Sequence, residues 1–171
     1  MMAPQDSVGT RPAEADAAEA GMEPHPVLSQ WERVRQGTLT TLGLFLEDEL
    51  GYAPAPGGRT IHEIALHIAH EEAIEVLHGT AKTLPVFPKA YEARDYPTPE
   101  SIGALLDGVH ARSLKYLRGL DEAALNTDIA LAWGETSTPL NAILHIIEHE
   151  VHHRGELSLA LGILGRSGFD A

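Results

Sequence analysis

Histidine is the residue type in this chain whose number and spacing suggest chemistry. The 171 residues include ten histidines, and most of them fall in two segments, 62–78 and 145–153. His149 and His153 lie four positions apart, so on an α-helix their imidazoles share one face, one turn apart. Imidazole is the commonest side-chain ligand of metal ions, and this spacing suits two adjacent positions on one divalent ion. The pair therefore indicates part of a metal site.

The earlier histidine-rich segment is expected to supply a third ligand. His67 lies inside the apolar run 64–68, which favours a position away from the outermost face, and His70, one turn further on, is the alternative. His78 lies at the end of the segment, where a protonated imidazole suits the helix dipole. Three neutral imidazoles would leave the ion its full charge and an open position. A water bound there would be deprotonated near neutral pH.

The same residues allow other interpretations. Residues 149–153 read His-Glu-x-x-His, the zinc-binding pattern in which the Glu is the general base of a metalloprotease. The chain offers neither a third ligand downstream nor an upstream strand pattern that could align a protease substrate, so this interpretation is disfavoured, but Glu150 remains a candidate base for another reaction. Two further possibilities stay open: a non-catalytic metal-binding stress-response protein, and a bundle of core histidines without any metal.

Helical periodicity of the apolar residues describes most of the chain. It predicts four long helices and one short one, over residues 26–50, 60–78, 98–119, 138–164 and 121–125. Thr60 with Glu63 forms a capping box, and Thr98 before Pro99 is a helix start of the N-cap type. Four long helices predict an all-α four-helix bundle that must bring the two histidine-rich segments together.

The first 26 residues differ in composition from the rest. They are rich in Ala, Glu, Asp, Pro and Gly and poor in large apolar residues, which is typical of a disordered acidic tail. We therefore expect one folded domain over residues 27–171. The start of the chain shows no basic flank followed by an apolar core, so we expect no secretion signal and a cytoplasmic location.

Charge and cysteine content exclude several functions. The formal net charge is −13, which disfavours nucleic acid and anionic membrane surfaces as partners. No apolar run reaches the roughly 18 residues of a membrane span. The chain has no cysteine, which excludes disulfides and a thiol nucleophile of the protein itself. A thiol, if one takes part, must come from a small molecule.

Two segments carry a resemblance to a known family. Residues 149–157 resemble the His-x-x-His-His-Arg-Gly-Gln signature of the DinB/YfiT-like proteins, with Glu156 where the family has Gln. Residues 60–69 are similar to the second-helix motif of that family, and the resemblance extends over about residues 27–170. It implies a four-helix bundle, often a homodimer, with a metal triad that corresponds to His67, His149 and His153.

The resemblance also implies a function. Members of the family include transferases and isomerases that depend on a low-molecular-weight thiol, so we expect a metal-dependent thiol transferase or hydrolase acting on a small molecule. Imidazole ligands suit zinc, nickel, copper or iron, and we expect zinc or nickel. Near the triad, His145 and His152 are candidate hydrogen-bonding neighbours. Glu71, one turn after His67, could accept its free N–H.

Overall fold

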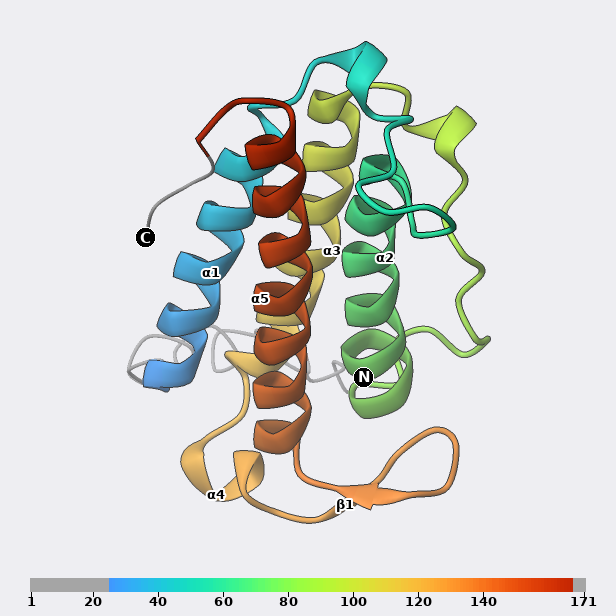
Figure 1. The fold of residues 1–171 in the computed structure, drawn as a ribbon. Coiled ribbons are helices and arrows are strands. Elements are labelled where there is room, and N and C mark those ends of the chain that lie inside the picture. Colours follow the sequence, from blue (N-terminus) through green and yellow to red (C-terminus); the bar gives the residue numbers. More distant parts are fainter. Residues whose placement is uncertain (1–24, 168–171) are drawn as a thin grey trace, which may run out of the picture.

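Four long helices dominate the computed structural model, which describes residues 25–167 (Figure 1). The predicted tail over residues 1–26 lies outside this range except for its last two residues. The long helices are α1 (Pro26–Leu42), α2 (Ile61–Glu72) with its π-helical continuation η2 (Ala73–Thr80), α3 (Pro99–Leu117) and α5 (Pro139–Ile163). The short elements are η1 (Glu47–Glu49), η3 (Ala93–Asp95), α4 (Glu122–Leu125), β1 (Ile129–Ala130) and β2 (Thr136–Ser137).

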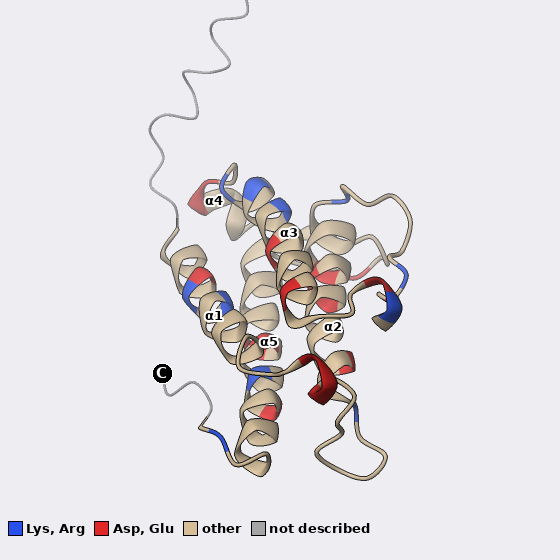
Figure 2. Ribbon diagram, turned by 90° about the horizontal axis from the view of Figure 1, so that it is seen from above, with Lys and Arg blue, Asp and Glu red and all other residues tan. Residues whose placement is uncertain are grey.

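The four long helices pack into a ring around a common core. α5 lies between α1 and α2 and packs on both, while α3 packs mainly on α2 and closes the ring toward α1. Figure 2 shows this arrangement along the bundle. The predicted all-α four-helix bundle is thus confirmed. None of the described helices has the length and apolar character needed to cross a lipid bilayer.

Threonine residues start three of the four long helices. The Oγ1 atoms of Thr60, Thr98 and Thr138 each accept a hydrogen bond from the backbone N–H three residues further on, at 3.1–3.2 Å. Each cap satisfies a backbone donor that has no partner inside the helix and contributes about 1 kcal/mol. The cap at Thr60 fixes where α2 begins and therefore where His67 lies.

The first helix is shorter than its periodicity predicted. α1 ends at Leu42 rather than near residue 50, and Gly43 is its C-cap. Beyond it, Arg166, from the segment after α5, donates hydrogen bonds to the Leu44 carbonyl and to the carboxylate of Glu49. Phe45 is buried in the core, whereas Leu46 is exposed. The apolar residues after Leu42 therefore belong to a turn that packs on the core. This turn is held by Arg166, which is distant in the sequence.

A buried polar cluster joins all four long helices. The Arg35 guanidinium donates to Glu72 at 2.6 Å, to Glu150 at 2.9 and 3.0 Å, and to the Leu106 carbonyl at 2.9 Å. The Trp31 indole N–H donates to Glu150 at 3.2 Å. Arg35 and both carboxylates are at most 1% exposed. One guanidinium lies between two carboxylates, and its ion pairs and hydrogen bonds to both lower the cost of burying them.

Candidate metal centre

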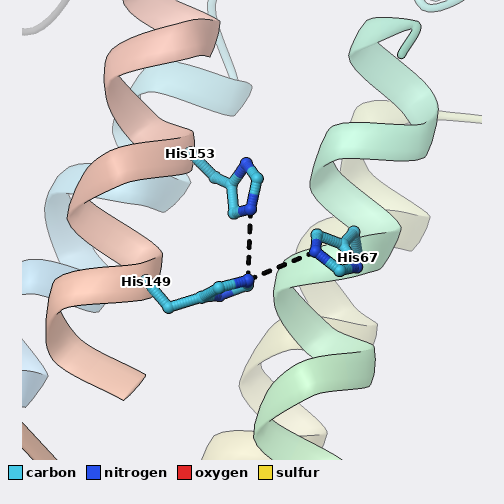
Figure 3. Close-up of side chains that lie close together, drawn as sticks. All are labelled: His67, His149 and His153. Carbon is cyan, nitrogen blue, oxygen red and sulfur yellow. Dashed lines mark hydrogen bonds between the residues drawn. The ribbon is translucent and has the colours of Figure 1, made fainter. Parts of the chain in front are cut away.

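The three histidines expected to form a triad lie together between α2 and α5. His67 comes from α2, and His149 and His153 come from α5, with all three rings directed into the same space (Figure 3). The Nε2 atom of His149 lies 3.2 Å from Nε2 of His67 and 3.1 Å from Nε2 of His153. Two helices that are far apart in the sequence thus bring three imidazole nitrogens to one point.

This spacing fits one divalent ion. Tetrahedral ligation at a zinc–nitrogen distance of about 2.0–2.1 Å separates ligand nitrogens by roughly 3.3–3.4 Å, close to the observed distances. A neutral imidazole carries one proton, so His149 cannot satisfy both of its neighbours through Nε2 by hydrogen bonding alone. A metal ion at the point where the lone pairs converge would satisfy all three.

Carboxylates on the outer sides of two ligands set the direction of these lone pairs. The Nδ1–H of His153 donates to Glu156 at 2.6 Å, and Nδ1 of His67 lies 3.5 Å from a carboxylate oxygen of Glu71. With the proton held at Nδ1, the Nε2 atom of each ring presents its lone pair to the centre. Such carboxylate–histidine pairs orient metal ligands and raise their basicity.

Burial favours the neutral form of two of the imidazoles. It lowers the pKa of His149 to about 3, assisted by the neighbouring His153 and His67. Burial also lowers the pKa of His67, and the charge of Arg59 acts in the same direction. Both effects disfavour the protonated form, so these rings are free to accept an ion near neutral pH.

The other residues expected near the triad take different positions. Glu71 faces His67 as described above, whereas His145 and His152 are largely exposed. His145 lies 4.0 Å from Glu75, and His152 lies 3.9 Å from Glu156. Both histidines lie beside carboxylates near the triad. Neither forms a hydrogen bond with a ligand ring in the described part of the chain.

Glu150, the candidate base, faces the core. It is fully buried, and its oxygens accept hydrogen bonds from Arg35 and Trp31. One step along a helix turns a side chain by about 100°, which separates Glu150 from the ligand face of His149. Because its oxygens are held by Arg35 and Trp31 in the core, Glu150 has no access to a molecule bound at the triad, and we do not retain it as a base.

The remaining histidines of α2 and η2 fasten a loop. His62, His70 and His78 each donate a ring N–H to a backbone carbonyl of the connection before α3, those of Tyr96, Pro88 and Leu84, at 2.8–3.1 Å. His70, the alternative to His67, is thus engaged with the loop, although it also lies near His67 and Glu71. These three histidines are spaced eight residues apart, and this regular spacing is the sequence feature that could have indicated a common role.

The protein is thus a helical bundle in which two helices present three converging imidazoles. This arrangement is suited to binding a metal ion. The chain belongs to the DinB superfamily, whose family model matches residues 30–157, the greater part of its length. The resemblance seen in the sequence is thereby confirmed. No curated protein matches the chain.

Three solved structures share the fold. The DinB-like protein YjoA of Bacillus subtilis is 19% identical, with a TM-score of 0.67 over 86% of this chain and 96% of its own. YfiT of Bacillus subtilis, described as a probable metal-dependent hydrolase with an unusual four-helix bundle topology, is 17% identical, with a TM-score of 0.64 over 97% and 95%. A DinB-like protein of Bacillus cereus is 21% identical, with a TM-score of 0.61 over 85% and 95%.

Proposed function

We propose that this protein is a metal-dependent enzyme that holds one divalent ion with His67, His149 and His153 and acts on a small molecule. The observation that carries the proposal is the convergence of three Nε2 atoms at 3.1 and 3.2 Å, and burial lowers the pKa of two of the rings, His149 and His67. The description of the similar protein YfiT as a probable metal-dependent hydrolase supports it. Zinc and nickel are the expected ions.

The residues around the triad have definite tasks under this proposal. A bound ion would supply Lewis acidity and lower the pKa of a water or thiol at its open position. Glu156 accepts the Nδ1–H of His153 and the carboxylate of Glu71 faces Nδ1 of His67 at 3.5 Å, which favours ligand atoms aimed at one point. A cavity beside His67 gives a small molecule access to the centre. Such a centre could support hydrolysis or thiol transfer.

Metal content of the untagged protein tests the binding step. Elemental analysis should find about one zinc or nickel ion per chain, and His67→Ala and His153→Ala should each lose it because two imidazoles bind far more weakly than three. His145→Ala, which removes an exposed histidine from the same helix, should keep the ion. No ion in the wild type, and no uptake of zinc or nickel, would overturn the proposal.

Turnover separates the enzyme from the alternative, a non-catalytic metal-binding protein of the stress response. The metal-loaded protein is assayed with activated esters for hydrolysis and with an electrophile plus a low-molecular-weight thiol for transfer. Either activity, lost in His67→Ala, supports catalysis and identifies the reaction type. A protein that keeps its ion but turns over neither substrate would favour the alternative.

The expected homodimer and cytoplasmic location belong to the same proposal. α5 carries four exposed apolar side chains, Leu144, Val151, Leu159 and Ile163. Covering them with a second copy of the chain would remove apolar surface from water. Light scattering should then give twice the mass of the chain, and Leu159→Glu should reduce it to the monomer mass.

A further inference from the structure

Two cavities flank the histidine triad. One, of about 480 Å³, lies along α2 and is lined by His67, Leu66, Tyr91 and Arg59, among others. The other, of about 370 Å³, is lined by Glu156, the partner of His153, and again by Arg59. Arg59 is therefore the charged residue that both cavities share, immediately before the start of α2.

The acidic residues that line these cavities are already engaged. Glu63 accepts hydrogen bonds from the backbone N–H and the hydroxyl of Thr60 at 2.8 and 3.0 Å, and Glu92 is paired with Arg94 at 2.7 Å. Glu156 accepts from His153 at 2.6 Å. Within residues 25–167, by contrast, the exposed guanidinium of Arg59 has neither a hydrogen-bonding nor an ion-pair partner.

The guanidinium and the triad face a common space, because Arg59 and His67 both line the cavity of about 480 Å³. In a chain of net charge −13, a cation at this place is a local exception. It would attract an anionic group that the rest of the surface repels.

We propose that Arg59 binds a carboxylate of the small molecule that reaches the triad, so that the site prefers carboxylate-bearing ligands over uncharged ones. The inference rests on the proposed function, because the other end of the ligand is taken to face the metal ion. The planar guanidinium matches a carboxylate through two parallel N–H···O hydrogen bonds, which a lysine cannot reproduce. Apolar walls such as Leu66 and Tyr91 leave room for the connecting carbon chain.

Cobalt-loaded protein provides a direct binding assay. 3-Mercaptopropionate and its uncharged counterpart 3-mercapto-1-propanol are titrated into it, and sulfur-to-cobalt charge-transfer absorption reports thiolate at the ion. The wild type should bind the acid roughly tenfold more tightly than the alcohol, as expected for one charge-assisted contact. Arg59→Gln should abolish the preference, and Arg59→Lys should retain part of it.

A matched control and a separate metal measurement make the outcomes distinct. Arg33→Gln removes an exposed arginine of α1 that bonds to Gln30 and lines neither cavity, and it should leave the preference unchanged. Equal affinities of the wild type for acid and alcohol, no binding of the acid, or a preference that survives in Arg59→Gln would each overturn the inference. Failure of the wild type to bind cobalt in a His67-dependent manner would instead contradict the proposed function.

Discussion

Glu156 is the residue at which this chain differs from the DinB/YfiT-like signature, and the structure gives the difference a physical consequence. Its carboxylate accepts the Nδ1–H of His153 at 2.6 Å, so a negative charge supports one ligand of the candidate centre. A glutamine could accept the same hydrogen bond but would bring no charge. The substitution is therefore expected to matter for affinity rather than for ligand geometry.

Glu156→Gln should weaken zinc binding by about tenfold, at the lower end of what loss of such a partner costs. Competition with a chelating dye measures the affinity. Glu148→Gln, which neutralises an exposed carboxylate on the same helix, is the matched control and should bind as the wild type does. Equal affinities in all three proteins would show that the charge on Glu156 does not reach the ion.

His149 links the site to pH. Its pKa in the folded protein is about 3, against a usual value of 6.5, so between these values the unfolded chain binds more protons than the folded one. The free energy of unfolding of the metal-free protein should therefore fall as the pH decreases through this window. Urea unfolding with a chelator present, between about pH 7 and pH 5, measures the fall.

The variant His149→Gln should show a smaller fall over the same range, because the group that takes up the proton on unfolding is gone. His145→Gln removes an exposed histidine from the same helix and should behave like the wild type. A His149→Gln protein with the pH dependence of the wild type would assign the effect to other groups.

At the scale of single elements, η2 and the β1–β2 hairpin depend on one another. A Cβ atom placed on Gly79 would lie 2.3 Å from the ring of Trp133, and the backbone N–H of Ala132 donates to the Gly79 carbonyl at 3.1 Å. The absence of a side chain at Gly79 thus lets the indole of the hairpin lie directly on the π-helix. The indole of Trp133 therefore has a packing role at this contact.

Gly79→Ala should destabilise the protein by about 1–3 kcal/mol because the new methyl group overlaps the indole. In a Trp133→Ala background the same change should cost much less, and the difference between the two is the coupling energy. Gly108→Ala is the control, since a Cβ there meets nothing within 4 Å in the described structure. Urea unfolding of the four variants measures these changes in the free energy of unfolding. Additive effects would contradict the contact.

At the scale of the whole molecule, the Arg35 cluster ties the bundle together. Arg35 on α1 contacts Glu72 on α2, Leu106 on α3 and Glu150 on α5. Because Glu150 follows His149 directly, the same cluster fixes the rotation of α5 that directs the ligands toward α2. The geometry of the candidate metal centre therefore depends on a polar core that lies outside the triad.

Arg35→Met should destabilise the fold by about 3–5 kcal/mol, since it leaves two buried carboxylates without a counter-charge. Urea unfolding measures the loss. Adding Glu72→Gln and Glu150→Gln should recover part of it, because the unpaired charges are then gone. Arg33→Met removes an exposed arginine of the same helix and should change stability by less than about 0.5 kcal/mol. A small effect of Arg35→Met would contradict this role.

The sequence by itself determined the bundle and the pair of ligands on α5. Apolar periodicity and threonine caps are local features, and they predicted the four long helices because each residue acts on its near neighbours. The His149–His153 pair could be derived in the same way, since four positions always share a helix face. The choice of His67 over His70 drew support from the family resemblance, and the convergence of ring nitrogens agrees with it.

Tertiary structure decided what local spacing leaves open. Glu150 appeared as a catalytic base from its place beside His149, yet Arg35, 115 residues away, makes it a core residue. The end of α1 was predicted too late because Arg166, which holds the following turn, lies at the other end of the chain. Arg59 gained significance only through the two cavities it lines. In each case the partner is distant in sequence, and a charged side chain takes its role from the partner that folding brings to it.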